Sequence, residues 1–157
     1  MDEHFDAVIA TAVGFLGLRA DSGFLVRVEF LGPQAAEIPP PSGLLREAQR
    51  QLAVWFTDPV FQFTIPCRLD GTAFQRKVWE QIATIPCGAV RTYSEVAKTI
   101  GSAPRAVGGA CGANPLPIVV PCHRVVAAHG IGGFNARRDG LDWLPIKRWL
   151  LRHEQER

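Results

Sequence analysis

Apolar side chains in the first part of the chain recur at every second residue. Over residues 24–30 the side chains that share one face are Phe24, Val26, Val28 and Phe30. This alternation is typical of a strand with one buried face. An apolar stretch over 5–13 and the turn residues Asp21-Ser22-Gly23 precede it. We therefore expect the chain to open as a β-hairpin or meander.

Helical spacing replaces this alternation after a proline-rich loop. The run Pro-Pro-Pro-Ser-Gly over 39–43 cannot hold a helix, because proline lacks the amide donor and its ring clashes with the preceding turn. From residue 44 the apolar side chains fall on one helical face: Leu44, Leu45, Ala48, Leu52, Trp55 and Phe56. An extended piece over 61–65 follows, and Asp70-Gly71 marks a boundary. Residues 1–70 are thus predicted to form a small structural domain, a sheet with one packed helix.

Three short helices are predicted in residues 71–157. The first begins at a capping box over 72–75 and stops at Pro86, and the second begins at a capping box over 92–95 and closes at Gly101. The third runs from about residue 104 to 111. Two short helices joined by a glycine-containing turn indicate a helix-turn-helix.

The composition is that of a globular protein with reduced thiols. The chain has 157 residues, of which 47% are hydrophobic and 20% charged. No apolar run approaches the ~18 residues of a membrane helix, and the acidic start is unlike a basic leader, so we expect a soluble, cytoplasmic protein. The cysteines lie too far apart for a CxxC metal site, and three of them are expected to be structural: Cys67, Cys87 and Cys111. We expect no metal.

Charge is divided unevenly between the two halves. Residues 1–70 hold five basic and nine acidic residues, a net −4, whereas residues 71–157 hold twelve and six, a net +6. Only the second part is suited to meet a polyanion, although such an excess also occurs on solvated surfaces without a nucleic-acid partner.

The third predicted helix contains Gly108 and Gly109, each of which costs about 1 kcal/mol relative to alanine. A missing side chain lets another backbone come close. That backbone is either a neighbouring protein segment or the sugar-phosphate wall of a nucleic-acid groove. In the second case Arg105 is placed to probe a minor groove.

Cys122 stands in an apolar run over 118–126 that a polar trio interrupts. A cysteine among aliphatic residues is commonly an inert hydrophobe. Here His123 and Arg124 follow directly, and cationic or hydrogen-bonding neighbours lower the pKa of a thiol. Adjacent side chains of a strand point to opposite faces. Either the backbone turns at this point, or a water relays the proton between Cys122 and His123.

Several motifs in order resemble the O6-alkylguanine-DNA alkyltransferases, also called methylated-DNA–protein-cysteine methyltransferases. The matching segments are Phe74 with Val78-Trp79, then 92–97, 105–110, 114–117, 121–125 and 150–154. The resemblance covers residues 72–154, whereas residues 1–70 are only compatible with it. It implies an α+β fold: a small sheet-and-helix domain over 1–70, then a helical, winged helix-turn-helix-like domain over 71–157 that carries the reactive cysteine.

The resemblance also implies the chemistry. The family moves a methyl or small alkyl group from O6 of guanine, and possibly from O4 of thymine, onto its own cysteine, here Cys122. His123 is expected to take the thiol proton through a water, Glu154 to orient the imidazole, Asn114 to brace the turn, and Tyr93 to donate its hydroxyl to the departing base. No cofactor is implied. The thioether product is not cleaved, so each molecule acts once.

The resemblance further implies a monomer that binds double-stranded DNA from the minor groove and rotates the damaged guanine out of the stack. Arg105 matches the residue that fills the vacated space. The other residues expected to contact DNA or the base are Ala106, Gly108, Gly109, Ala110, Arg124, Phe134 and Asn135.

The segment 133–145 departs from the family pattern, because Phe134 replaces a tyrosine and a glycine pair is absent. The range of alkyl groups is therefore open. Two other functions remain alternatives. One is a DNA-binding protein that senses the lesion without chemistry, and the other is a thiol hydrolase built on Cys122, His123 and Glu154.

Overall fold

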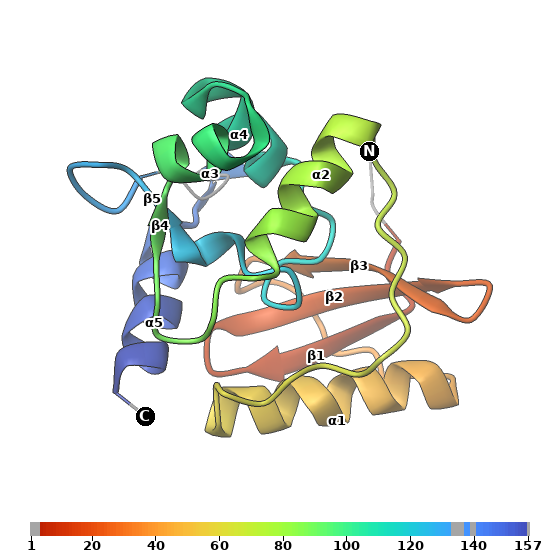
Figure 1. Ribbon diagram of the computed structural model, residues 1–157. Helices are drawn as coiled ribbons and strands as arrows, with labels where there is room; N and C mark the ends of the chain where they lie inside the picture. Colours follow the sequence, from red (N-terminus) through yellow and green to blue (C-terminus); the bar gives the residue numbers. More distant parts are fainter. Residues whose placement is uncertain (1–3, 133–136, 139–140, 157) are drawn as a thin grey trace. The chain divides into compact units, whose positions relative to one another are not determined.

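The chain separates at Asp70 into two units, Met1–Asp70 and Gly71–Arg157. The computed structural model describes residues 4–132, 137–138 and 141–156 (Figure 1). Each unit has its own layer of buried apolar side chains, and each is described by itself.

The first unit opens with the expected antiparallel meander. Strands β1 (Ala7–Thr11), β2 (Gly14–Asp21) and β3 (Phe24–Phe30) pair in the order β1-β2-β3. Ser22 and Gly23, at φ 51° and 86°, form the tight turn between β2 and β3. Two positive φ values in succession give the turn twist that matches a hairpin.

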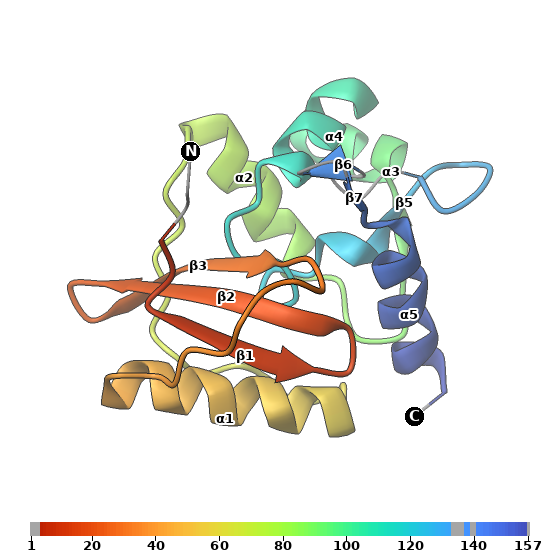
Figure 2. The same cartoon turned by 180° about the vertical axis from the view of Figure 1, so that it is seen from behind.

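Helix α1 (Gly43–Thr57) covers one face of this sheet, as both views show (Figures 1 and 2). The Ser42 side chain caps its first turn. Four residues of the apolar stripe are buried and two are half-buried: Leu45, Ala48, Leu52 and Trp55, and Leu44 and Phe56. Residues 61–65, expected to be extended, belong to no helix or strand. The buried side-chain carbonyl of Gln51 instead accepts the amides of Thr64 and Ile65, at 2.9 and 3.2 Å.

The second unit begins with two helices that start where the capping boxes predict. Helix α2 (Ala73–Ile82) follows Thr72, and helix α3 (Tyr93–Ile100) follows Thr92. Gly101, at φ 70°, ends α3 in the left-handed conformation that glycine favours. Helix α2 ends before Pro86, because the amides of Thr84 and Ile85 donate to carbonyls three residues back and form tighter turns.

Helix α4 (Pro104–Gly112) follows α3 after residues 101–103, which gives a helix-turn-helix. The indole Nε1 of Trp79 donates to the Ala110 carbonyl at 2.8 Å and joins α2 to α4. The core between these helices consists of Val78, Trp79, Ile82, Val96, Ala97, Val107 and Ala110.

The rest of the second unit carries the predicted cysteine motif. Strand β4 (Arg91–Thr92) pairs in parallel with β5 (Val125–Val126), and β6 (Arg137–Arg138) pairs with β7 (Leu141–Asp142) (Figure 2). Helix α5 (Leu144–Gln155) buries Lys147, Leu150 and Glu154. The architecture is the expected α+β class. None of the helices in the described residues has the length and apolarity to cross a membrane.

Candidate functional site

Cys122 begins a short 3₁₀ helix, η1 (Cys122–Arg124), at the end of a tightly folded loop. Within the loop, Ile118 is buried at φ 74°, a strained value for a β-branched residue. The Val120 amide donates to Leu116 O and the Cys122 amide to Val120 O, both at 2.8 Å. Of the two alternatives for this motif, the backbone turn is therefore present.

Asn114 holds this loop against the sulfur. Its Nδ2 donates to the Val120 carbonyl at 2.9 Å and lies 3.1 Å from Cys122 Sγ. Its Oδ1 accepts the amide of Leu116 at 2.9 Å. One side chain thus fixes both ends of the loop and supplies a hydrogen-bond donor to the sulfur. Such a donor favours the thiolate.

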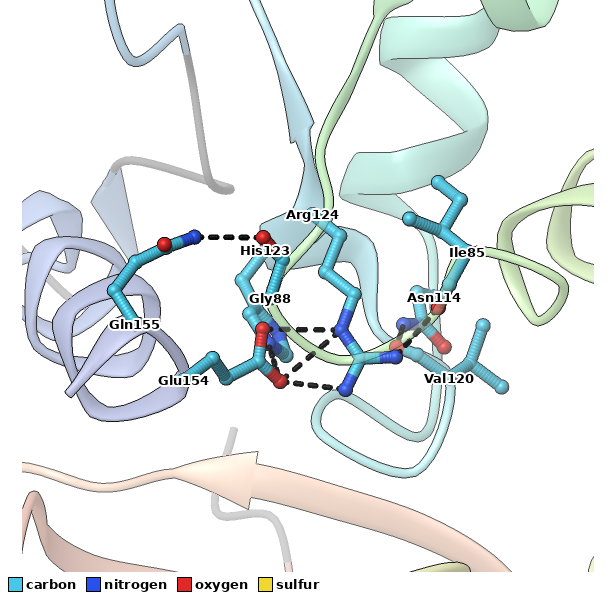
Figure 3. Close-up of polar contacts among 8 residues, drawn as sticks. All are labelled: Ile85, Gly88, Asn114, Val120, His123, Arg124, Glu154 and Gln155. Carbon is cyan, nitrogen blue, oxygen red and sulfur yellow. Dashed lines mark hydrogen bonds and ion pairs between the residues drawn. The ribbon is translucent and has the colours of Figure 1, made fainter. Parts of the chain in front are cut away.

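His123 and Glu154 lie together inside the second unit (Figure 3). The imidazole Nε2 is 3.0 Å from Glu154 Oε2, and the two side chains are 0% and 1% exposed. Burial lowers the pKa of His123, and the nearby carboxylate offsets only part of this. A neutral imidazole that shares its Nε2 proton with Glu154 keeps Nδ1 as its basic nitrogen.

Arg124 occupies a different place from the one expected for a DNA contact. Its guanidinium is buried, with Nε 3.0 Å from both carboxylate oxygens of Glu154 and Nη2 2.5 Å from Oε2. Its Nη1 donates to the Ile85 carbonyl at 2.6 Å (Figure 3). The expected DNA contact is wrong, because Nε and Nη2 of the guanidinium donate to the Glu154 carboxylate and Nη1 donates to the Ile85 carbonyl. Arg124 therefore supports Glu154.

Glu154 is ionised at every ordinary pH. Burial by itself would raise the pKa of this carboxyl, but the hydrogen bonds and charges of His123 and Arg124 outweigh burial and lower the pKa to about 2. The buried carboxylate is thus a fixed negative charge that orients the imidazole.

Two further residues, Cys111 and Lys147, act electrostatically on the Cys122 thiol, and the sequence does not identify them. Cys111 is half-buried on the last turn of α4. Lys147 of α5 is fully buried, and its Nζ donates to the Val125 carbonyl at 2.7 Å. Lys147 shares the buried face of α5 with Leu150 and Glu154. Lysine is almost never fully buried unless it is paired, so its position on this face is the sequence signal that could have identified it.

The two thiols perturb each other. Interaction with Cys111, together with burial, raises the pKa of the Cys122 thiol. Interaction with Cys122 lowers the pKa of the Cys111 thiol. This reverses the expectation that His123 and Arg124 lower the pKa of Cys122, because Arg124 is bound to Glu154 and Cys122 is only 4% exposed.

Tyr93, the first residue of α3, is half-buried in the second unit. Lys147 Nζ is 5.7 Å from the centroid of its ring, within the range of a cation–π contact. Gly132, at φ 75°, approaches the ring so closely that a Cβ there would lie 2.8 Å from Tyr93 Cε2. Only glycine fits beside this ring.

Helix α4 presents a smooth surface at its outer side. Arg105, Ala106 and Gly109 are exposed, and Gly108 is half-buried. A Cβ on Gly108 or Gly109 meets no atom within 4 Å, the helix's own backbone aside. Within the described part of the chain, no protein segment therefore explains the two glycines.

Ala110 does not share this surface, although the sequence places it among the DNA contacts. Its side chain is only 3% exposed and packs in the core under α4. Helical rotation turns it away from the outer side. Phe134 and Asn135, the two other expected contacts, lie outside the described residues.

The residues of the second unit match a known protein family. Residues 73–156 match the profile of the 6-O-methylguanine DNA methyltransferase, DNA binding domain. The methylated-DNA–protein-cysteine methyltransferase of Methanosarcina acetivorans is 39% identical over 156 residues, 94% of this chain and 96% of that protein. Its counterpart from Archaeoglobus fulgidus is 44% identical over 108 residues, 69% and 74% of the two chains.

Solved structures agree with the sequence matches. The O6-methylguanine methyltransferase of Mycobacterium tuberculosis superimposes with a TM-score of 0.80 at 37% identity, covering 96% of this chain and 92% of that one. The Mycobacterium tuberculosis protein OGT in complex with DNA gives a TM-score of 0.80 at 36% identity, covering 95% and 91%.

Proposed function

The chain belongs to the O6-methylguanine DNA methyltransferase family, and we propose that Cys122 is the residue that receives the alkyl group. The protein repairs DNA by transferring an alkyl group from the DNA to one of its own cysteines. The observation that supports Cys122 is the placement of its sulfur, which Asn114 contacts at 3.1 Å beside the His123–Glu154 pair.

The reaction is an in-line displacement at a saturated carbon. The Cys122 thiolate attacks the alkyl carbon, the bond from that carbon to O6 breaks, and the electron pair stays on the oxygen. A soft sulfur anion suits this attack. The departing guanine takes a proton, and a donor at this position lowers the barrier. We assign that donor to Tyr93. The thioether is stable, so the protein acts once.

His123 and Glu154 form the proposed proton-accepting pair. The Glu154 carboxylate fixes the imidazole through Nε2, and a water joins Nδ1 to the thiol. Arg124 acts behind them, because its guanidinium keeps Glu154 ionised and in place. Asn114 positions the sulfur and stabilises its anion.

DNA is the partner of this protein, and we propose that α4 enters its minor groove. The side-chain-free surface at the half-buried Gly108 and the exposed Gly109 supports this, since no described segment of the protein fills it. Arg105, exposed on the first turn of α4, is proposed to fill the space of the extruded guanine.

The remaining assignments follow from the same reaction. A reactive thiol must stay reduced, so we place the protein in the cytoplasm. We assign DNA binding and alkyl acceptance to residues 71–157, and a structural role to residues 1–70. One cysteine and one lesion suffice for the reaction, so we propose that the protein acts as a monomer.

Transfer of a labelled methyl group tests the acceptor. Duplex DNA with isotope-labelled O6-methylguanine is incubated with the wild-type protein, with Cys122→Ser and, as a matched control, with Cys87→Ser. We expect protein-bound label for the wild type and the control and none for Cys122→Ser, which should still bind the duplex. Label on Cys122→Ser would move the acceptor to another residue.

A further inference from the structure

The loop over residues 114–122 contains a backbone conformation that its sequence does not favour. Ile118 has a φ of 74°. Among the non-glycine residues that the structure describes, only Ser22 shares a positive φ, and Ser22 belongs to an exposed hairpin turn. The left-handed region suits glycine, whereas a β-branched side chain there raises the free energy of the backbone. The surrounding structure must therefore hold Ile118 in this conformation.

Burial of the side chain and two hydrogen bonds hold Ile118 in place. The residue is only 2% exposed, and Leu116 and Val120 on either side of it are also buried. The Val120 amide donates to the Leu116 carbonyl at 2.8 Å, which closes the chain around Ile118. Asn114 Oδ1 accepts the Leu116 amide at 2.9 Å and fixes the start of this turn. Leaving the left-handed conformation would move the Ile118 side chain out of its buried position.

The reversal of the chain at Ile118 sets the position of the nucleophile. Ile118 is halfway between Asn114 and Cys122 in the sequence, and the turn brings Val120 back to Asn114 (Figure 3). The Val120 carbonyl accepts both Asn114 Nδ2, at 2.9 Å, and the Cys122 amide, at 2.8 Å. The same Nδ2 lies 3.1 Å from Cys122 Sγ. A different φ at residue 118 would move Val120, and with it the sulfur, away from this donor.

We propose that Ile118 is a positioning residue for alkyl transfer: its left-handed backbone, held by the buried side chain, keeps the Cys122 sulfur within hydrogen-bond distance of Asn114. This inference rests on the function proposed above and adds a residue to it. Isoleucine suits this role better than glycine, which adopts the same φ without strain but also leaves it freely. The strained residue gives the loop one conformation, and the sulfur one position, before the damaged base arrives.

The Asn114 hydrogen bond matters because burial opposes ionisation of the sulfur. Interaction with Cys111 of α4, together with burial, raises the pKa of the Cys122 thiol, whereas Asn114 and the charge of Lys147 on α5 oppose this rise. Loss of the Asn114 contact should therefore raise the pKa further and slow transfer at neutral pH. The other buried charged or titratable groups of η1 and α5 in this unit are His123, Arg124 and Glu154.

Three variants of residue 118 separate the backbone from the packing. Ile118→Val keeps a buried β-branched side chain. Ile118→Ala and Ile118→Gly both remove it, but only glycine adopts a positive φ without strain. Methyl transfer from a methylated duplex is followed as a function of pH under single-turnover conditions with saturating protein, and folding is checked by circular dichroism. Ile82→Ala, which truncates a buried isoleucine of α2, is the matched control.

We expect the rate profiles of Ile118→Val and Ile82→Ala to coincide with that of the wild type. The profile of Ile118→Ala should move to higher pH by about one unit, which slows transfer about tenfold at neutral pH. Ile118→Gly should lie between Ile118→Ala and the wild type. Packing alone predicts the opposite order, because glycine removes one more carbon than alanine. In the Asn114→Ala background the Ile118 substitutions should add no further shift, since the contact that they disturb is already absent.

A wild-type profile for Ile118→Ala would overturn the proposal, because the sulfur would not depend on this residue. A larger shift for Ile118→Gly than for Ile118→Ala would also overturn it and leave Ile118 as a packing residue, and so would a further shift in the Asn114→Ala background. Folding of the glycine variant without folding of the alanine variant would support the proposal, whereas loss of folding in both would overturn it. Absence of transfer to wild-type Cys122 would instead refute the proposed function itself.

Discussion

Replacing Gly109 by alanine should change the stability of the protein and its affinity for DNA in opposite directions. Gly109 lies inside the helix, is exposed, and would give its new Cβ no contact within 4 Å apart from the helix's own backbone. Alanine is favoured over glycine in a helix by about 1 kcal/mol, largely because it restricts the unfolded chain. We therefore expect the free energy of unfolding to rise by about 1 kcal/mol, and the melting temperature by roughly 2–4 °C for a chain of this size.

The same methyl group should weaken DNA binding. If the backbone of α4 approaches the groove at Gly109, the added Cβ must displace the phosphodiester wall or hold the helix away from it. A loss of about 1.4 kcal/mol corresponds to tenfold lower affinity, and we expect a loss of this order.

Urea unfolding and fluorescence anisotropy with a labelled duplex measure the two effects. Gly43→Ala, in the exposed first turn of α1, is the matched control, since it adds a helical Cβ in the other unit. It should leave the DNA affinity unchanged. Unaltered affinity for Gly109→Ala, with a normal gain in stability, would refute the minor-groove role of α4. A loss of stability would refute the open surface described at Gly109.

Three other predictions concern the site. Arg105→Ala should slow repair in a duplex more than reaction with the free base O6-methylguanine, and equal losses on both substrates would remove the flipping role from Arg105. Asn114→Ala should lower the free energy of unfolding by about 2 kcal/mol in urea, because it leaves a buried carbonyl and amide unpaired, and should slow transfer at neutral pH. The lowered pKa of Glu154 contributes stability above about pH 4.5 that is lost as the pH falls toward 2, on the order of 3 kcal/mol. The free energy of unfolding of Glu154→Gln, measured as a function of pH, should lack this loss. The same acid dependence in Glu154→Gln as in the wild type would contradict the ion-pair geometry.

Local sequence signals predicted where α2 and α3 begin and where α3 ends. Both capping boxes and the terminal Gly101 act through hydrogen bonds within a few residues, so the sequence order alone determines them. The end of α2 was less predictable, because Thr84 and Ile85 exchange helical hydrogen bonds for tighter turns.

Contacts between distant segments were not predictable in the same way. Cys111 of α4 and Lys147 of α5 act electrostatically on Cys122, and no local pattern indicates that interaction. For the same reason Arg124, two residues after the cysteine in sequence, binds a glutamate far along the chain. The pKa of the Cys122 thiol follows from these neighbours and from burial. It is raised, whereas sequence adjacency to His123 predicts a lowered pKa.

The mass of the Cys122 peptide tests the central claim most directly. Wild-type protein is incubated with an equimolar duplex that contains O6-methylguanine, digested, and analysed by tandem mass spectrometry. We predict that Cys122 gains one methyl group in place of one hydrogen, in an amount equal to the guanine restored in the DNA, and keeps it after removal of the DNA. An unmodified Cys122 beside restored guanine, or a methyl group on any other residue, would contradict the account.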